Sequence, residues 1–216
     1  MSTEVKEPLF SKKNKKLITD PLNDSNPISV QVLGICSALA ITVQVKQAVV
    51  MSLSVAAVLI FSNLIVSMMR NMIPDRIRII VQLVVVAFLV ICVDQVLKAF
   101  VYDVSKQLSV FVGLIITNCI IMGRLEAFAL GNKPGPAVMD AVGNAAGYAW
   151  ILIVVAVARE IFGSGKFWGV QIIPDAVYEM GYVNNGLMIL PPMALVLVGI
   201  IIWIQRSKNE KLIESN

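Results

Sequence analysis

The chain has 216 residues, of which 57% are hydrophobic and 15% are charged. Soluble domains are about half apolar and about a quarter charged, so this composition excludes an ordinary soluble domain and predicts one integral membrane domain. The formal net charge is +4, and five lysines lie within the first 16 residues. A basic patch of this kind can bind nucleic acid. Ahead of an apolar segment, however, it is typical of a cytoplasmic tail, and no nucleic-acid partner is expected.

Six apolar segments follow this tail. A membrane-spanning helix needs about 20 residues at a rise of about 1.5 Å per residue. The first and fourth segments are short for a span and contain polar atoms, which predicts that their helices are short or broken. The six segments are Ile28–Gln44, Ala48–Met69, Ile77–Ala99, Leu108–Gly123, Ala137–Ala158 and Gly186–Ile204.

The distribution of Lys and Arg predicts the orientation of the chain. Alternate tails and loops carry 13 basic residues on one side and 5 on the other. Because the more basic side is cytoplasmic, both termini should lie in the cytoplasm. We expect a basic tail over residues 1–26, a transmembrane domain over 27–205 and a second cytoplasmic tail over 206–216. The start of the chain loosely fits a secretory leader, but the rest is polytopic, so we expect no cleavage there.

The segment lengths repeat as short, long, long in each half of the chain. Three spans are an odd number, so the second half should enter the membrane from the opposite face, as an inverted repeat. Paired short segments in inverted halves are typical of broken helices that meet near the membrane midplane. The predicted fold is therefore an all-α integral membrane protein with six transmembrane helices in two inverted three-helix repeats.

Each short segment contains one cysteine, Cys36 in "VLGICSALAIT" and Cys119 in "LIITNCIIMGR". Equivalent positions in inverted halves would let the two thiols face each other. Cysteine in apolar surroundings is usually a small packing residue, and Cys92, which has no repeat counterpart, is interpreted in that way. The chain has no histidine, so a metal would be held by thiolate or oxygen. Thiolates suit zinc or an iron–sulfur centre that usually takes four, and a partner chain would supply the other two.

Two aspartates form a second group of candidates. Asp94 lies near the outer end of the third segment, and acids inside spans are costly and often functional. The alternative for Asp94 is an interfacial ion pair with Lys98, four residues further on. Asp140 opens the fifth segment near the cytoplasm, where it can simply cap a helix start. Their places near opposite faces make both candidates for an ion path, because oxygen ligands suit hard cations.

Amides and glycines within the segments receive structural interpretations. The side chains of Asn63, Asn118 and Asn144 are expected to form hydrogen bonds between helices. Gly143 and Gly147 form a GxxxG motif, which is typical of a close packing face.

Charged residues at the segment ends are expected to form local ion pairs, Arg124 with Glu126 and Arg159 with Glu160. The sequence contains no glycine-rich nucleotide loop, P-loop or nucleophile elbow. Any redox chemistry would therefore use electrons that other subunits deliver.

Four stretches resemble the family of membrane proteins formed by the D- and E-type subunits of Nqr and the A- and E-type subunits of Rnf. The similarity runs from about Asn26 to Ile204, and its most specific part surrounds Cys119. "GICSALA" and "KQLSVFVGLI" are more similar to the sodium-translocating NADH:quinone reductase members than to the Rnf members. The four stretches are "NPISVQVLGICSALAIT", "NMIPDRIRIIVQ", "VDQVLKAFVYDVSKQLSVFVGLIITNCIIMGRLEAFA" and "REIFGSGKFWG".

The resemblance implies a six-span protein of the bacterial inner membrane, in a complex with five other subunits and closest to a homologous E-type subunit. It implies a [2Fe-2S] cluster shared with that E-type subunit, to which this chain would contribute Cys36 and Cys119. NAD and flavins would be bound only on other subunits, and electrons would pass from NADH towards ubiquinone while Na+ is exported. Membrane acids of the family are candidates for sodium handling, and Asp94 and Asp140 occupy the matching positions. Cys92 matches no ligand.

Three alternatives stay open at this point. The chain can be the equivalent subunit of an Rnf complex. It can be a small-molecule permease with inverted repeats and no redox role, or a structural partner of a pump in which the cysteines matter only for assembly. In the preferred interpretation, the chain alone has neither NADH nor quinone activity.

Overall fold

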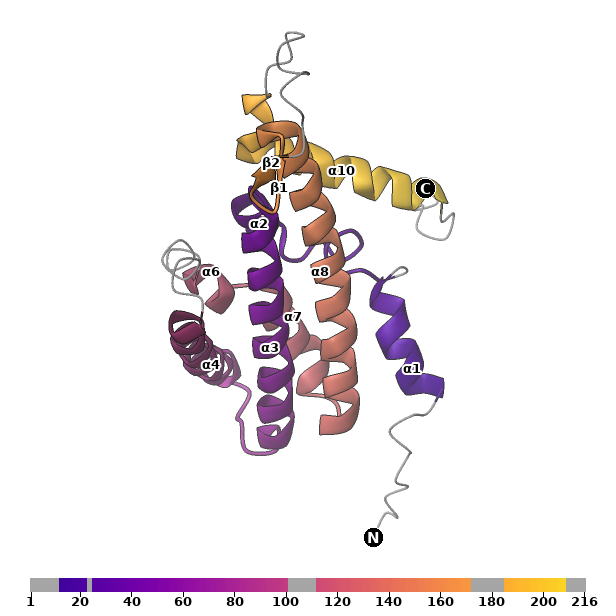
Figure 1. Cartoon of the computed structure of the whole chain (residues 1–216). Coiled ribbons are helices and arrows are strands. Elements are labelled where there is room, and N and C mark those ends of the chain that lie inside the picture. The colour runs from indigo at the N-terminus through magenta and orange to yellow at the C-terminus, as the bar shows by residue number, and fades with distance from the viewer. Residues whose placement is uncertain (1–11, 23–24, 101–111, 172–184, 209–216) are drawn as a thin grey trace, which may run out of the picture.

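The structure, a computed structural model, describes residues 12–22, 25–100, 112–171 and 185–208. These parts are almost entirely helical (Figure 1). One small antiparallel hairpin, β1 (Lys166–Phe167) with β2 (Val170–Gln171), follows the longest helix. The helices and helical turns are α1 (Lys12–Thr19), η1 (Asp20–Leu22), α2 (Ile35–Ile41), α3 (Val45–Met69), α4 (Arg78–Phe100), α6 (Val112–Ile116), α7 (Cys119–Arg124), the π-helical turn η2 (Leu125–Ala129), α8 (Pro134–Ser164), η3 (Gly186–Ile189) and α10 (Pro191–Lys208).

Helices α3 and α8 lie side by side at the centre and run in opposite directions (Figure 1). Near the end of α3, Asn63 Nδ2 donates a hydrogen bond to the carbonyl of Ala137 near the start of α8, at 3.3 Å. At the other end of the pair, the first amide of α3, Val45 N, donates to Glu160 Oε2 near the end of α8, at 2.5 Å. Opposite directions are what inverted repeats predict for these two helices, and the interhelical role expected for Asn63 is confirmed.

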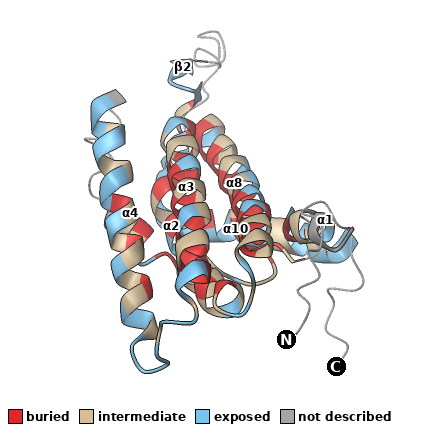
Figure 2. Cartoon of the chain, turned by 90° about the horizontal axis from the view of Figure 1, so that it is seen from below, coloured by how far each residue is buried: buried red, intermediate tan, exposed pale blue. Residues whose placement is uncertain are grey.

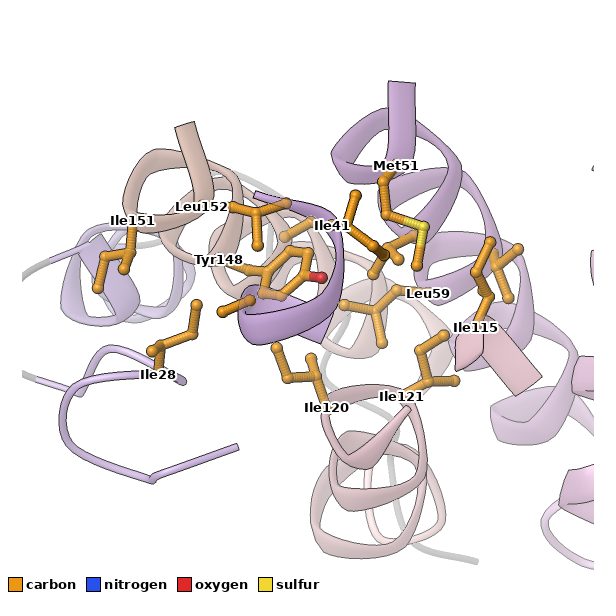
Figure 3. Packing of buried hydrophobic residues seen from close by; sticks show 14 of the residues in the cluster. Ile28, Ile41, Met51, Leu59, Ile115, Ile120, Ile121, Tyr148, Ile151 and Leu152 are labelled. Carbon is orange, nitrogen blue, oxygen red and sulfur yellow. The ribbon is translucent and has the colours of Figure 1, made fainter. Parts of the chain in front are cut away.

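The buried core lies between this pair and the shorter helices. Met51 and Leu59 of α3, Leu152 of α8 and Ile120 of α7 are at most 1% exposed, and Figure 3 shows their side chains converging. In lipid the hydrophobic effect does not drive helices together, so close packing and buried hydrogen bonds supply the association.

The first and fourth segments contain short, interrupted helices, as the sequence predicts. Helix α2 has only seven residues and begins after Gly34, which adopts a left-handed conformation with φ 79°. In the fourth segment, Asn118 separates α6 from α7 with an extended backbone, and its side chain accepts a hydrogen bond from Ile120 N at 3.1 Å. A left-handed glycine and a capping asparagine are typical breaks in a helix. Residues 108–111 of this segment lie outside the described residues.

The two short helices diverge from a common start. The far end of α2 leads directly into α3, close to the end of α8. The far end of α7 carries Arg124, which bonds to Asp140 in the first third of α8. Helices α2 and α7 are therefore half-helices that point towards opposite ends of the α3–α8 pair.

The N-terminal residues 12–22 pack against α8 rather than extend away from it (Figure 1). A Cβ atom on Gly147 would lie 2.3 Å from the Pro21 carbonyl oxygen, and one on Gly143 would lie 2.6 Å from that of Leu17. The GxxxG motif is thus a close packing face, as expected, but it receives the backbone of the N-terminal segment. Residues 1–11 of the predicted tail lie outside the described residues.

Three of the described helices, α3, α4 and α8, are long and apolar enough to cross a membrane. Only 17% of the apolar window of α4 is buried, and this helix stands at the edge of the molecule (Figure 2). Its exposed apolar face suits lipid or a partner chain. Helix α10, which holds most of the sixth segment, runs across the end of α8 (Figure 1). The all-helical class and three span-length helices are confirmed, and six spans stay a prediction.

Candidate metal centre

The two symmetric cysteines lie at the common start of the half-helices. Cys36 is the second residue of α2, and Cys119 is the first residue of α7. Their thiols are close enough to interact directly. Both residues are exposed, so the pair opens onto the surface of this chain. The structure brings together the two residues that the repeat pattern selected, and their role as ligands stays a prediction.

The donor set is that of a shared site. Among residues 12–22, 25–100, 112–171 and 185–208, no group of three or more Cys, Asp or Glu residues could hold a metal ion. Cys36 and Cys119 supply two soft ligands, which is half of what a [2Fe-2S] centre usually takes. Because both thiols are exposed, a second chain can supply the other half. The site fits a cluster at an interface between two chains.

Local electrostatics also suit thiolate ligands. Cys36 and Cys119 both lie in the first turn of a helix that leads away from them. The partial positive charge at a helix start favours a negative group placed there.

Sequence reasoning missed Tyr148, which lies at the middle of α8 and is fully buried. Its hydroxyl donates to Ser37 Oγ at 2.7 Å, and Ser37 Oγ donates to the carbonyl of Gly34 at 2.8 Å. The Tyr148 hydroxyl also interacts with the side chain of Asn118. A usable signal was present, because a tyrosine inside an apolar span must find a hydrogen-bond partner for its hydroxyl.

Asp140 does not cap a helix start. Helix α8 begins at Pro134, with Lys133 at the N-cap, and Asp140 is the seventh residue of the helix. Its carboxylate is 2% exposed and forms an ion pair with Arg124, whose Nε donates to Oδ2 at 2.9 Å and whose Nη2 donates to Oδ1. Asn144 Nδ2 donates to the same Oδ1 at 3.1 Å. Both carboxylate oxygens are engaged, and a role in an ion path stays a prediction.

The expected pair of Arg124 with Glu126 is wrong. Glu126 Oε1 pairs instead with Arg78 Nη2 at 2.5 Å, and its Oε2 accepts from Gln82 Nε2 at 3.1 Å. Residues two apart on a helix point in different directions, so each side chain finds a partner on another element.

The expected pair of Arg159 with Glu160 is also wrong, since neighbours on a helix diverge as well. Arg159 Nη1 donates to Thr42 Oγ1 at 2.6 Å and to the Leu39 carbonyl at 3.3 Å, which caps the end of α2. Glu160 accepts from Val45 N and so caps the start of α3. Together they fix the α2–α3 junction to α8. The other guanidinium nitrogens of Arg159 donate to the carbonyls of Met188, Ile189 and Leu190.

Asp94 forms the expected ion pair, with 2.6 Å between its Oδ2 and Lys98 Nζ. Cys92, two residues earlier on α4, is exposed and lines an apolar groove of about 530 Å³ between α3 and α4. Cys92 therefore lies outside the buried core of this chain. Neither residue approaches the Cys36–Cys119 pair in a contact that the structure describes, and a sodium role for Asp94 stays a prediction.

An antiparallel pair of span-length helices, with two opposed half-helices between them, defines a helical membrane protein. Residues 14–202 match the family described as "Rnf-Nqr subunit, membrane protein". The chain belongs to the Rnf-Nqr family, which confirms the resemblance found in the sequence.

Relatives of the chain share one description, the D-type subunit of the Na(+)-translocating NADH-quinone reductase. The relative from Aeromonas hydrophila subsp. hydrophila is 55% identical over 201 residues, which cover 93% of this chain and 96% of the relative. The relative from Photobacterium profundum is 56% identical over 193 residues, covering 89% and 92%. The relative from Shewanella sp. (strain ANA-3) is 51% identical over 205 residues, covering 95% and 98%.

Proposed function

We propose that this chain is the D-type subunit of a Na+-translocating NADH:quinone reductase. It works in the bacterial inner membrane as a multi-pass protein with both termini in the cytoplasm, and it has no NADH or quinone activity of its own. The family match, and relatives of 51–56% identity that cover nearly the whole chain, support this assignment over a member of an Rnf complex. The observation that carries a redox role is the exposed pair of thiols at the start of both half-helices.

In this proposal Cys36 and Cys119 hold one half of a [2Fe-2S] cluster, and a homologous E-type subunit holds the other half. The bound cluster supplies one-electron transfer inside the membrane. The contribution of this chain is to place two thiols side by side where α2 and α7 begin. Four further subunits complete the complex and carry the NAD and flavin sites.

The arrangement also suggests how electron passage is coupled to Na+ export. Helices α2 and α7 start together and lead to opposite ends of the molecule, so a change of charge at their start acts on both at once. Asp94 and Asp140 are proposed to lie near the two mouths of the sodium path. Sodium export that stays tightly coupled to turnover, in a complex that lacks the cluster, would contradict this coupling.

The experiment that tests the assignment is complementation of a strain that lacks the gene for this chain. An affinity tag on the restored chain should recover the whole complex with Na+-stimulated NADH:quinone reductase activity. Cys36→Ser and Cys119→Ser should each abolish quinone reduction, while NADH oxidation by an artificial acceptor at the flavin-bearing subunits continues. Cys92→Ser is the matched control and should behave as the wild type. Full quinone reductase activity in both variants would instead support a permease or a purely structural role.

A further inference from the structure

We infer that Tyr148 is a positioning residue that ties the starts of both half-helices to one point on α8 and thereby sets the separation of the Cys36 and Cys119 thiols. The meaning of that separation, as the geometry of a ligand pair, rests on the proposed function. The geometric part of the inference does not.

The first observation is the hydrogen-bond chain into α2. The Tyr148 hydroxyl donates to Ser37 Oγ, and Ser37 Oγ donates to the Gly34 carbonyl, where α2 begins. Both Ser37 and Tyr148 are fully buried, so water does not compete for these bonds. Ser37 directly follows Cys36, so this chain of bonds fixes the backbone turn that carries the first thiol.

The second observation is the contact with α7. Asn118 caps α7 through Oδ1, and its side chain also interacts with the Tyr148 hydroxyl. Its Nδ2 is buried without a well-formed hydrogen bond in the described part of the chain. Asn118 directly precedes Cys119, so the same phenol lies beside the residues that flank both thiols.

The third observation is the tight packing around Gly34. A Cβ atom placed there would lie 2.8 Å from Ile120 Cδ1 and 3.3 Å from Tyr148 Cε2. The start of α2 is therefore held between the first turn of α7 and the phenol ring. Figure 3 shows Tyr148 and Ile120 within the same buried cluster.

Half-helices this short depend on such contacts. Helices α2 and α7 have seven and six residues, and isolated helices need more than about 12 residues to be even marginally stable in water. Arg159 holds the far end of α2, and Arg124 anchors the far end of α7. Tyr148 is the side chain on α8 that contacts the two starts, where the thiols lie.

The test uses the purified complex with Tyr148→Phe, Ser37→Ala and the double variant. Phenylalanine keeps the ring packing and removes only the hydroxyl. Ser62→Ala is the matched control, because Ser62 is also fully buried and also bonds to a carbonyl three residues back. After chelator treatment, a bifunctional thiol reagent of fixed short length is added, and the Cys36–Cys119 linked peptides are measured by mass spectrometry. The intact complex is examined by electron paramagnetic resonance and redox titration.

Tyr148→Phe and Ser37→Ala should each lower cross-linking about fivefold, the change expected when one net hydrogen bond is lost. Each should also shift the spectrum and midpoint potential of the reduced centre. The double variant should lose no more than either single one, since both remove the same bond, and Ser62→Ala should match the wild type. If Tyr148→Phe fails to assemble, Ser37→Ala decides the question.

Wild-type cross-linking and an unchanged spectrum in both single variants would overturn the inference. The two proposals fail separately. Iron that persists in Cys36→Ser and Cys119→Ser would remove the cluster assignment, while the cross-linking of otherwise wild-type cysteines would still report whether Tyr148 sets their separation.

Discussion

Arg124 and Asp140 join α7 to α8 through a two-point ion pair whose side chains are 15% and 2% exposed. Arg124 occupies the far end of the half-helix that begins with Cys119, and Asp140 lies eight residues before Tyr148 on α8. At about 1.5 Å of rise per residue, these two anchors of α7 are about 12 Å apart along α8. The ion pair therefore fixes one end of the half-helix whose other end carries a thiol.

Arg124→Ala should destabilise the complex strongly, because it leaves the buried carboxylate of Asp140 without its cation. Breaking one side of a buried pair costs about 3–5 kcal/mol. Replacing both residues with leucine should recover most of that loss, since removal of the whole pair can be nearly neutral. Thermal unfolding of the purified complex measures all three proteins. A double variant as unstable as Arg124→Ala would show that the ion pair is not the cause.

Gly147→Ala should displace the N-terminal segment from α8. The new methyl group would lie 2.3 Å from the Pro21 carbonyl oxygen, a backbone atom that cannot simply rotate away. Overpacking of this kind costs about 1–3 kcal/mol. Gly199→Ala on α10 is the control, because no atom among the described residues lies within 4 Å of the place that its Cβ would take, and alanine favours a helix by about 0.5–1 kcal/mol over glycine. Equal melting temperatures for the two variants would contradict the packing argument.

Gly34→Ala should be more harmful than the same change at Gly169. Both glycines have positive φ, 79° and 83°, so each substitution carries a backbone cost of about 1–2 kcal/mol. Only at Gly34 would the methyl group also meet Ile120, at 2.8 Å. We expect Gly34→Ala to lower the iron content of the complex as well as its melting temperature. A loss of stability at Gly169 that equals the loss at Gly34 would show that backbone strain alone accounts for both.

Asp94→Asn separates a sodium role from a simple surface ion pair. If Asp94 lies at the mouth of the sodium path, this change should raise the Na+ concentration needed for half-maximal turnover, by about tenfold or more when a carboxylate ligand is lost. Lys98→Met removes the other half of the pair and should change stability by only about 0.2–0.5 kcal/mol. Steady-state activity against Na+ concentration measures both. An unchanged Na+ dependence in Asp94→Asn would assign Asp94 to the ion pair with Lys98 alone.

The sequence predicted the features that depend on local pattern. Segments too short for a span predicted the breaks before α2 and α7, and the cysteine in each short segment predicted the Cys36–Cys119 pair. Length and composition predicted α3, α4 and α8, although α8 extends beyond Ala137–Ala158 at both ends. Each of these features can be read within one segment or by comparing two.

Features that depend on tertiary contacts were missed or wrong. Tyr148 and Ser37 are 111 positions apart, and no local pattern links them. Arg124 and Arg159 were assigned to carboxylates nearby in the chain, but helix geometry points those neighbours elsewhere. The length of α10 was suggested by hydropathy, whereas its direction depends on what it packs against.

The most direct measurement is the iron and acid-labile sulfide content of the purified complex for the wild type, Cys36→Ser and Cys119→Ser. Assembly should be checked by native gel, and Cys92→Ser serves as the control. The shared-cluster proposal predicts that each of the two variants loses about two irons, the content of one [2Fe-2S] centre, while all subunits remain assembled. Unchanged iron and sulfide with retained turnover in both variants would contradict the proposal and assign both thiols to helix packing.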